Sequence, residues 1–96
     1  MLRLEQARAL FNARFPDRKK SQTDVATAMF PKSTAQSAKQ QYSHLKSGKR
    51  DKVAVEAVVA AANELDIDYN FLFNHESEYD DLYKKLIVEV EEEVPK

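Results

Sequence analysis

The chain has 96 residues, enough for one domain with a modest hydrophobic core but not for two. A single glycine and three prolines favour helices, and the lack of cysteine excludes disulfides and thiolate metal sites. The net charge of −1 hides an asymmetry, because ten basic residues outnumber three acidic ones between Arg14 and Lys52, whereas twelve acidic residues and three lysines occur from Val53 to Lys96. This division favours one half that contacts a polyanion; the alternative is a solvated surface of uneven charge.

The pattern predicts a first amphipathic helix over residues 3–15 and a basic connector, PDRKK, after it. The apolar positions of that helix are Leu4, Ala7, Leu10, Phe11 and Phe15. A second helix begins at the stretch SQTDVA, where Ser21 is a good N-cap and Asp24 is a shorter substitute for the usual Glu of a capping box. We expect this helix to end before Pro31, because the residue before a proline disfavours helical geometry.

A third helix is predicted over residues 35–46, and the preceding KSTAQS is either a turn or the start of that helix. Its apolar stripe is Ala35, Ala38, Tyr42 and Leu45, which makes Tyr42 a core residue rather than a base-stacking one. The opposite face carries Gln36, Gln40, Ser43, His44 and Ser47, with Ser37 and Gln41 at its edges. No carboxylate occurs between Thr34 and Arg50, which is unusual for a solvated helix face. Gly48 suits a left-handed end to the helix.

Helices are also expected over residues 53–65, after a cap at Asp68, and from Ser77 onward. The last of these has the apolar stripe Tyr79, Leu82, Tyr83, Leu86, Ile87 and Val90. That stripe needs burial, either by folding back on the chain or by pairing with a second copy. The ending IVEVEEEV also alternates as a strand would, and we expect the terminal EEEVPK to be disordered.

The outer face of the third helix has the chemistry of a major-groove reader. Gln side chains present a donor and an acceptor together, which suits the edge of adenine, and Ser and His can take either role. Lysines at the ends of the helix would neutralise phosphates without reading sequence. The start of the second helix, Ser21 to Thr23, would attract phosphate through backbone N–H groups and side chains.

Three stretches together resemble the lambda-repressor-like (Cro/C1, XRE-type) helix-turn-helix family. They are SQTDVA, similar to the opening of that family's second helix; YSHLKSGKR, similar to the end of its recognition helix; and VEAVVAAANELDIDYNFLF, similar to its last two helices. The resemblance implies an all-α fold with a five-helix bundle over residues 1–73. Residues 74–96 add an acidic amphipathic helix and tail. This C-terminal segment is a candidate dimerisation element. The interval from Ala26 to Gly48 is longer than is usual in the family, which leaves the register of the recognition helix open.

Two groups of site residues follow from the charge pattern and the resemblance. The base-contacting group is Gln36, Lys39, Gln40, Gln41, Ser43 and His44. The phosphate-contacting group is Arg18, Lys19, Lys20, Ser21, Gln22, Thr23, Lys32, Lys46, Lys49 and Arg50. Two alternatives stay open, because Arg18 to Lys20 could be a solvated loop and His44 could be merely exposed.

We therefore expect a sequence-specific DNA-binding transcriptional regulator, a repressor of bacterial or phage type, that is cytoplasmic and associated with the nucleoid. Its expected partners are double-stranded DNA and a second copy of itself, with no membrane and no small-molecule substrate. No catalytic constellation is evident, and His44 and His75 lack metal-ligand spacing, so we expect no enzymatic activity, no cofactor and no metal. The alternative is a protein-interaction module, antitoxin-like or a phage adaptor, whose acidic C-terminal segment binds a partner protein.

Overall fold

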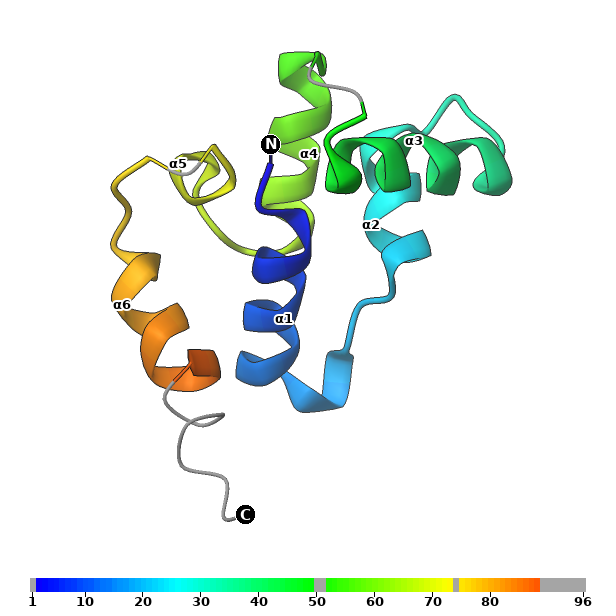
Figure 1. The fold of residues 1–96 in the computed structure, drawn as a ribbon. Helices are drawn as coiled ribbons and strands as arrows, with labels where there is room; N and C mark the ends of the chain where they lie inside the picture. The colour runs from blue at the N-terminus through cyan, green and yellow to red at the C-terminus, as the bar shows by residue number, and fades with distance from the viewer. Residues whose placement is uncertain (1, 50–51, 74, 89–96) are drawn as a thin grey trace.

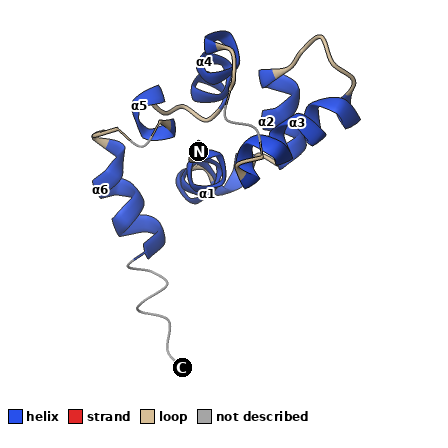
Figure 2. Ribbon diagram, turned by 45° about the horizontal axis from the view of Figure 1, so that its top comes forward, coloured by secondary structure: helices blue, strands red, loops and turns tan. Residues whose placement is uncertain are grey.

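A computed structural model of the chain describes residues 2–49, 52–73 and 75–88, and all regular structure within these ranges is helical (Figures 1 and 2). The elements are α1 (Leu4–Arg14), the 3-10 turn η1 (Pro16–Arg18), α2 (Gln22–Met29), α3 (Ala35–Ser47), α4 (Val55–Glu64), α5 (Tyr69–Leu72), α6 (Tyr79–Tyr83) and the π-helical η2 (Lys84–Val88). The all-α prediction is confirmed, and the helix bounds agree with the expected ranges to within about two residues. No described helix has the length and apolar character needed to cross a membrane.

The core lies where α1 meets the faces of the other helices. α1 contributes Leu4, Ala7, Leu10 and Phe11, all buried and all on the stripe predicted from their spacing. Phe15, the fifth predicted position, follows the end of α1 and is only partly buried against the core. The other helices supply buried side chains that form one hydrophobic cluster with this stripe: Val25, Ala26, Met29, Ala38, Tyr42, Leu45, Ala57, Val58, Ala61, Ala62, Phe71 and Leu72.

α2 begins with the predicted capping box. The Asp24 backbone N–H donates to Ser21 Oγ at 3.1 Å, and the Ser21 N–H donates to Asp24 Oδ2 at 2.9 Å. These two bonds satisfy donors that the first turn of a helix leaves free, so the shorter Asp serves in place of Glu. The hydrogen bonds to Asp24 lower its pKa, the bond from the Ser21 backbone most of all.

A short turn connects α2 to α3. The Ser33 N–H donates to the Phe30 carbonyl at 3.1 Å, and Thr34 then caps α3 by accepting from the Ser37 N–H at 3.1 Å. KSTAQS is therefore turn as far as Ser33, and helix begins after Thr34. At the other end Gly48 has a φ of 81°, the left-handed conformation that was predicted, where a side chain would clash.

α4 and α5 complete the body. α4 packs against α2 on one side and α5 on the other, and both views show it between them (Figures 1 and 2). The predicted cap of α5 is confirmed, since Asp68 Oδ1 accepts from the Phe71 N–H at 3.0 Å. The chain turns between the two helices at Asp66, whose φ is 48°.

The C-terminal segment folds back on α1. Tyr79, Leu82, Tyr83 and Leu86 are partly buried against the core, and Arg3 pairs with Asp80 at 3.1 Å. Of the two expected ways to bury this stripe, the structure thus has the intramolecular one. Residues 84–88 are helical, and the remainder of IVEVEEEV, including Val90 and the EEEVPK expected to be disordered, lies outside the described residues.

Candidate nucleic-acid interface

The outer face of α3 is built by the burial of its inner face. Ala38, Tyr42 and Leu45 are at most 1% exposed, which confirms Tyr42 as a core residue. Helical geometry then turns residues between these positions to the outside. The exposed side chains of the central part of α3 are Gln36, Ser37, Lys39, Gln40 and Ser43. Gln36, Gln40 and Ser43 follow one another at spacings of four and three, so they form one row of polar side chains.

Two predicted base-contacting residues lie at the margin of this row. Gln41 is half-buried, and its Nε2 donates to Ser33 Oγ in the preceding turn at 3.1 Å. His44 is also half-buried, and its backbone carbonyl accepts from the Ser47 hydroxyl at 3.3 Å. The structure therefore groups Gln36, Gln40 and Ser43 in one row and directs the Gln41 amide toward the α2–α3 turn.

Lysines occur at both ends of α3 and along one edge. Lys32 is exposed in the turn before the helix, and Lys49 is exposed just after Gly48. Lys39 is exposed and Lys46 half-buried, and the two are seven residues apart, about two helical turns. Arg50, the last of the predicted phosphate contacts, lies outside the described residues. With no carboxylate among them, these groups give the α3 surface a positive rim.

The predicted basic clamp at residues 18–20 lies at the N-terminal end of α2 (Figure 1). Arg18 and Lys19 are exposed. Lys20 instead reaches α4, where its Nζ lies 2.7 Å from Glu64 Oε1. The structure therefore places two exposed cations here and a third that is paired with a carboxylate.

The start of α2 holds the other predicted phosphate contacts. Ser21 Oγ is engaged in the capping box. Thr23 is half-buried, and its carbonyl accepts from the Thr27 hydroxyl at 2.9 Å. Gln22 is half-buried as well, and its Nε2 donates to Glu5 Oε1 on α1 at 2.7 Å. An amide nitrogen carries two hydrogens, so Gln22 keeps one N–H beyond the bond to Glu5.

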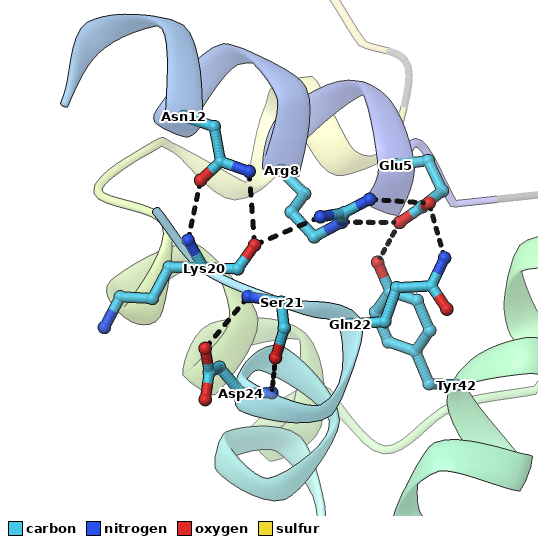
Figure 3. Close-up of polar contacts among 8 residues, drawn as sticks. All are labelled: Glu5, Arg8, Asn12, Lys20, Ser21, Gln22, Asp24 and Tyr42. Carbon is cyan, nitrogen blue, oxygen red and sulfur yellow. Dashed lines mark hydrogen bonds and ion pairs between the residues drawn. The ribbon is translucent and has the colours of Figure 1, made fainter. Parts of the chain in front are cut away.

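Glu5 is the centre of a polar cluster that joins α1, α2 and α3 (Figure 3). Besides Gln22, its carboxylate accepts from Arg8 Nε at 3.0 Å, from Arg8 Nη2 at 3.2 Å and from the Tyr42 hydroxyl at 2.6 Å. Burial raises the pKa of Glu5, but the hydrogen bonds from Arg8, Tyr42 and Gln22 outweigh it and lower the pKa to about 2. Burial and the bond to Glu5 raise the pKa of Tyr42, so the hydroxyl remains protonated as the donor.

The same face of α1 fixes the chain before α2. Asn12 Oδ1 accepts from the Lys20 N–H at 2.7 Å, and Asn12 Nδ2 donates to the Lys20 carbonyl at 3.1 Å. Arg8 Nη1 donates to that same carbonyl at 3.1 Å. Glu5, Arg8 and Asn12 recur at spacings of three and four, which places them in one row on α1.

The polar row of Glu5, Arg8 and Asn12 was not among the predicted site residues. The signal was present, because each of the three residues follows a buried apolar residue, Leu4, Ala7 or Phe11, and therefore borders the buried face of α1. The pattern alone does not single these residues out, because charged side chains beside an apolar stripe are usually solvated.

The described residues contain no group of three or more His, Cys, Asp or Glu side chains that could hold a metal ion. Comparisons of the chain with protein-family models, with curated proteins and with solved structures found no match.

Proposed function

We propose that the chain is a sequence-specific DNA-binding regulator, a repressor of bacterial or phage type, with a lambda-repressor-like helix-turn-helix arrangement. The observation that carries the proposal is the exposed row Gln36, Gln40 and Ser43 on α3, free of carboxylates and flanked by Lys32 and Lys49. α3 would enter the major groove, and α2 would rest across the phosphate backbone. The proposal includes no enzymatic activity and no cofactor.

The polar row and the flanking lysines have different chemistry, so we expect them to have different roles in DNA binding. The Gln36 and Gln40 amides offer paired donors and acceptors that match adenine, and the Ser43 hydroxyl can meet either kind of base edge. Lys32 and Lys49 would contact phosphates, which give affinity for any sequence and make it depend on salt. Sequence preference should therefore depend on the row, and overall affinity on the lysines.

The first test replaces one member of each group. Gln40→Ala should relax base preference at one or two positions and weaken binding to a duplex obtained by in vitro selection by about 1–3 kcal/mol. Lys49→Ala should weaken binding to selected and random duplexes alike and flatten the dependence of affinity on salt. Fluorescence anisotropy titrations over a series of salt concentrations would measure both effects.

The control is Asn63→Ala, which removes an exposed amide from α4 and should leave both affinities unchanged. Equal losses on selected and random duplexes for Gln40→Ala and Lys49→Ala would contradict the assignment of the two roles.

A second copy of the chain is part of the proposal, because paired half-sites on DNA match a two-fold dimer. The described large apolar side chains that remain well exposed lie along α4 and α5: Val55, Val59, Tyr69 and Phe73. They line one groove together with Val58. The residues that line the groove belong to α4 and to α5 with its C-cap. α5 lies across α4 from α2 and α3 (Figures 1 and 2), so a partner in the groove would leave both α3 surfaces accessible.

The exposed apolar area of this groove indicates how strongly two copies of the chain could associate. Four such side chains expose on the order of a few hundred Å², less than the roughly 800 Å² per partner that a stable complex buries. We therefore expect copies that join only on adjacent half-sites. Val55→Glu should abolish cooperative binding to a duplex with two half-sites while affinity for one half-site is retained; cooperativity that survives the change would contradict this interface.

The second candidate function is a protein-interaction module, antitoxin-like or a phage adaptor, whose acidic C-terminal segment binds a partner. The observation that favours it is the exposure of Glu76, Glu78 and Asp81 around α6. Anisotropy titration on a random duplex separates the two functions. Micromolar binding that weakens with salt supports DNA binding, and no binding at low salt supports the interaction module.

A further inference from the structure

The rotation of α3 about its own axis decides which side chains it presents. Ala38 and Leu45 attach the helix to the body through apolar contacts, which are non-directional and constrain its rotation only through packing. Tyr42 differs, because its hydroxyl donates a 2.6 Å hydrogen bond to Glu5 Oε2 on α1. Hydrogen bonds weaken steeply as their angle departs from linearity, so this bond resists rotation of α3.

Glu5 is itself held on both oxygens. Oε2 accepts from Arg8 Nε as well as from Tyr42, and Oε1 accepts from Arg8 Nη2 and from Gln22 Nε2. The bidentate pair with Arg8 fixes the plane of the carboxylate on α1. The two remaining bonds then reach one residue of α2 and one of α3, as Figure 3 shows.

We propose that Glu5 is a positioning residue for sequence reading, which sets the rotation of α3 through Tyr42 and the placement of the Gln22 amide at the start of α2. This inference rests on the proposed DNA-binding function. It assigns a role in DNA recognition to a residue of α1 that touches no base and that lies behind the reading surface.

Base contacts and phosphate contacts should respond differently to a loss of Glu5. A base edge is read by hydrogen bonds of defined direction, so a small rotation of α3 moves Gln36 and Gln40 out of reach. Lysine side chains are long and rotatable, and a phosphate can be contacted from many directions. Loss of Glu5 should therefore reduce discrimination between sequences more than it reduces binding as such.

The experiment measures affinity for two duplexes of equal length, one obtained by in vitro selection with the wild-type chain and one of random sequence. Glu5→Gln should lower the ratio of the two affinities about tenfold, the loss of about one base contact. Affinity for the random duplex should change far less, because misplacement of the Gln22 amide weakens one phosphate contact while the loss of a negative charge favours approach to the phosphates. Tyr42→Phe removes only the hydroxyl and should lower the ratio without a change of charge.

A destabilised control separates positioning from stability. Ile67→Ala truncates a buried side chain in the turn between α4 and α5 and should lower the thermal midpoint while it leaves the affinity ratio unchanged. The double variant Glu5→Gln/Tyr42→Phe should lose less discrimination than the sum of the two single losses, because both substitutions act on the same bond: the first removes its charge assistance and the second removes its donor.

The outcomes distinguish the two levels of the proposal. If the wild-type chain binds neither duplex in a salt-dependent way, the proposed function fails. If the wild-type chain discriminates but folded Glu5→Gln and Tyr42→Phe keep the full ratio, the positioning role is wrong. A matching fall in the ratio for Ile67→Ala would also overturn it, since destabilisation alone would then explain the effect.

Discussion

A chain that carries Phe71→Ala is expected to lose about 3–5 kcal/mol of its free energy of unfolding, the usual cost of removing a buried ring. Phe71 is fully buried. Its ring lies 5.7 Å from that of Tyr83, centroid to centroid, and the Arg3 guanidinium lies 3.9 Å above it. The residue therefore joins α5 to the N-terminus of α1 and to the C-terminal segment, so its loss loosens three parts of the chain together.

Small domains have only about 5–15 kcal/mol of stability in total. Urea unfolding followed by circular dichroism should accordingly show a much lower midpoint for Phe71→Ala. Phe73→Ala is the matched control, because that ring is 41% exposed and two residues away. It should cost far less, and a similar loss for both variants would show that the α5 contacts do not hold the C-terminal segment.

Acid should destabilise the chain through Glu5. Its pKa is lowered from an ordinary 4.5 to about 2 in the folded chain. Between these two pH values the unfolded chain therefore binds a proton at this carboxylate that the folded chain does not bind. Stability from this group is present above about pH 4.5 and is lost as the pH falls toward 2. By linkage, this pKa shift corresponds to about 3 kcal/mol of the free energy of unfolding. Because the carboxylate is partly exposed, we expect about 2 kcal/mol.

Glu5→Gln isolates this contribution, because the amide does not titrate. Urea midpoints would be measured from about pH 6 to about pH 2.5. As the pH falls, the midpoint should decrease less steeply for Glu5→Gln than for the wild-type chain. Glu56→Gln, which alters an exposed carboxylate on α4, should keep the wild-type profile. Parallel profiles for Glu5→Gln and wild type would mean that the carboxylate is not held by hydrogen bonds as the structure shows.

Local signals predicted most of the fold. Ser21, Asp68 and Gly48 mark helix ends through bonds or backbone conformations that depend on neighbouring residues alone, and the structure confirms all three. The spacing of Leu4, Ala7 and Leu10 likewise fixes the buried face of α1 without knowledge of what covers it. The C-terminal stripe left two alternatives, since an apolar face shows that it needs a partner but not which partner.

The candidate site was predictable only where it depends on one helix. The row on α3 follows from the period of that helix and the burial of Tyr42. The bonds of Tyr42 and Gln22 to Glu5 join residues 37 and 17 positions apart, and a period within one helix carries no information about such contacts. Lys20 shows the same limit, because its pairing with Glu64 depends on how α2 and α4 lie side by side.

The two faces of α3 have separate duties. The helix is held in place by the buried side chains of Ala38, Tyr42 and Leu45. The side chains of Gln36, Gln40 and Ser43 are exposed and take no part in the core. Exposed positions of this kind tolerate replacement within about 0.5 kcal/mol. Under the proposed DNA-binding function, new target sequences could therefore be sought by randomising the three outer positions while the inner ones, and the Glu5 carboxylate beneath them, stay as they are.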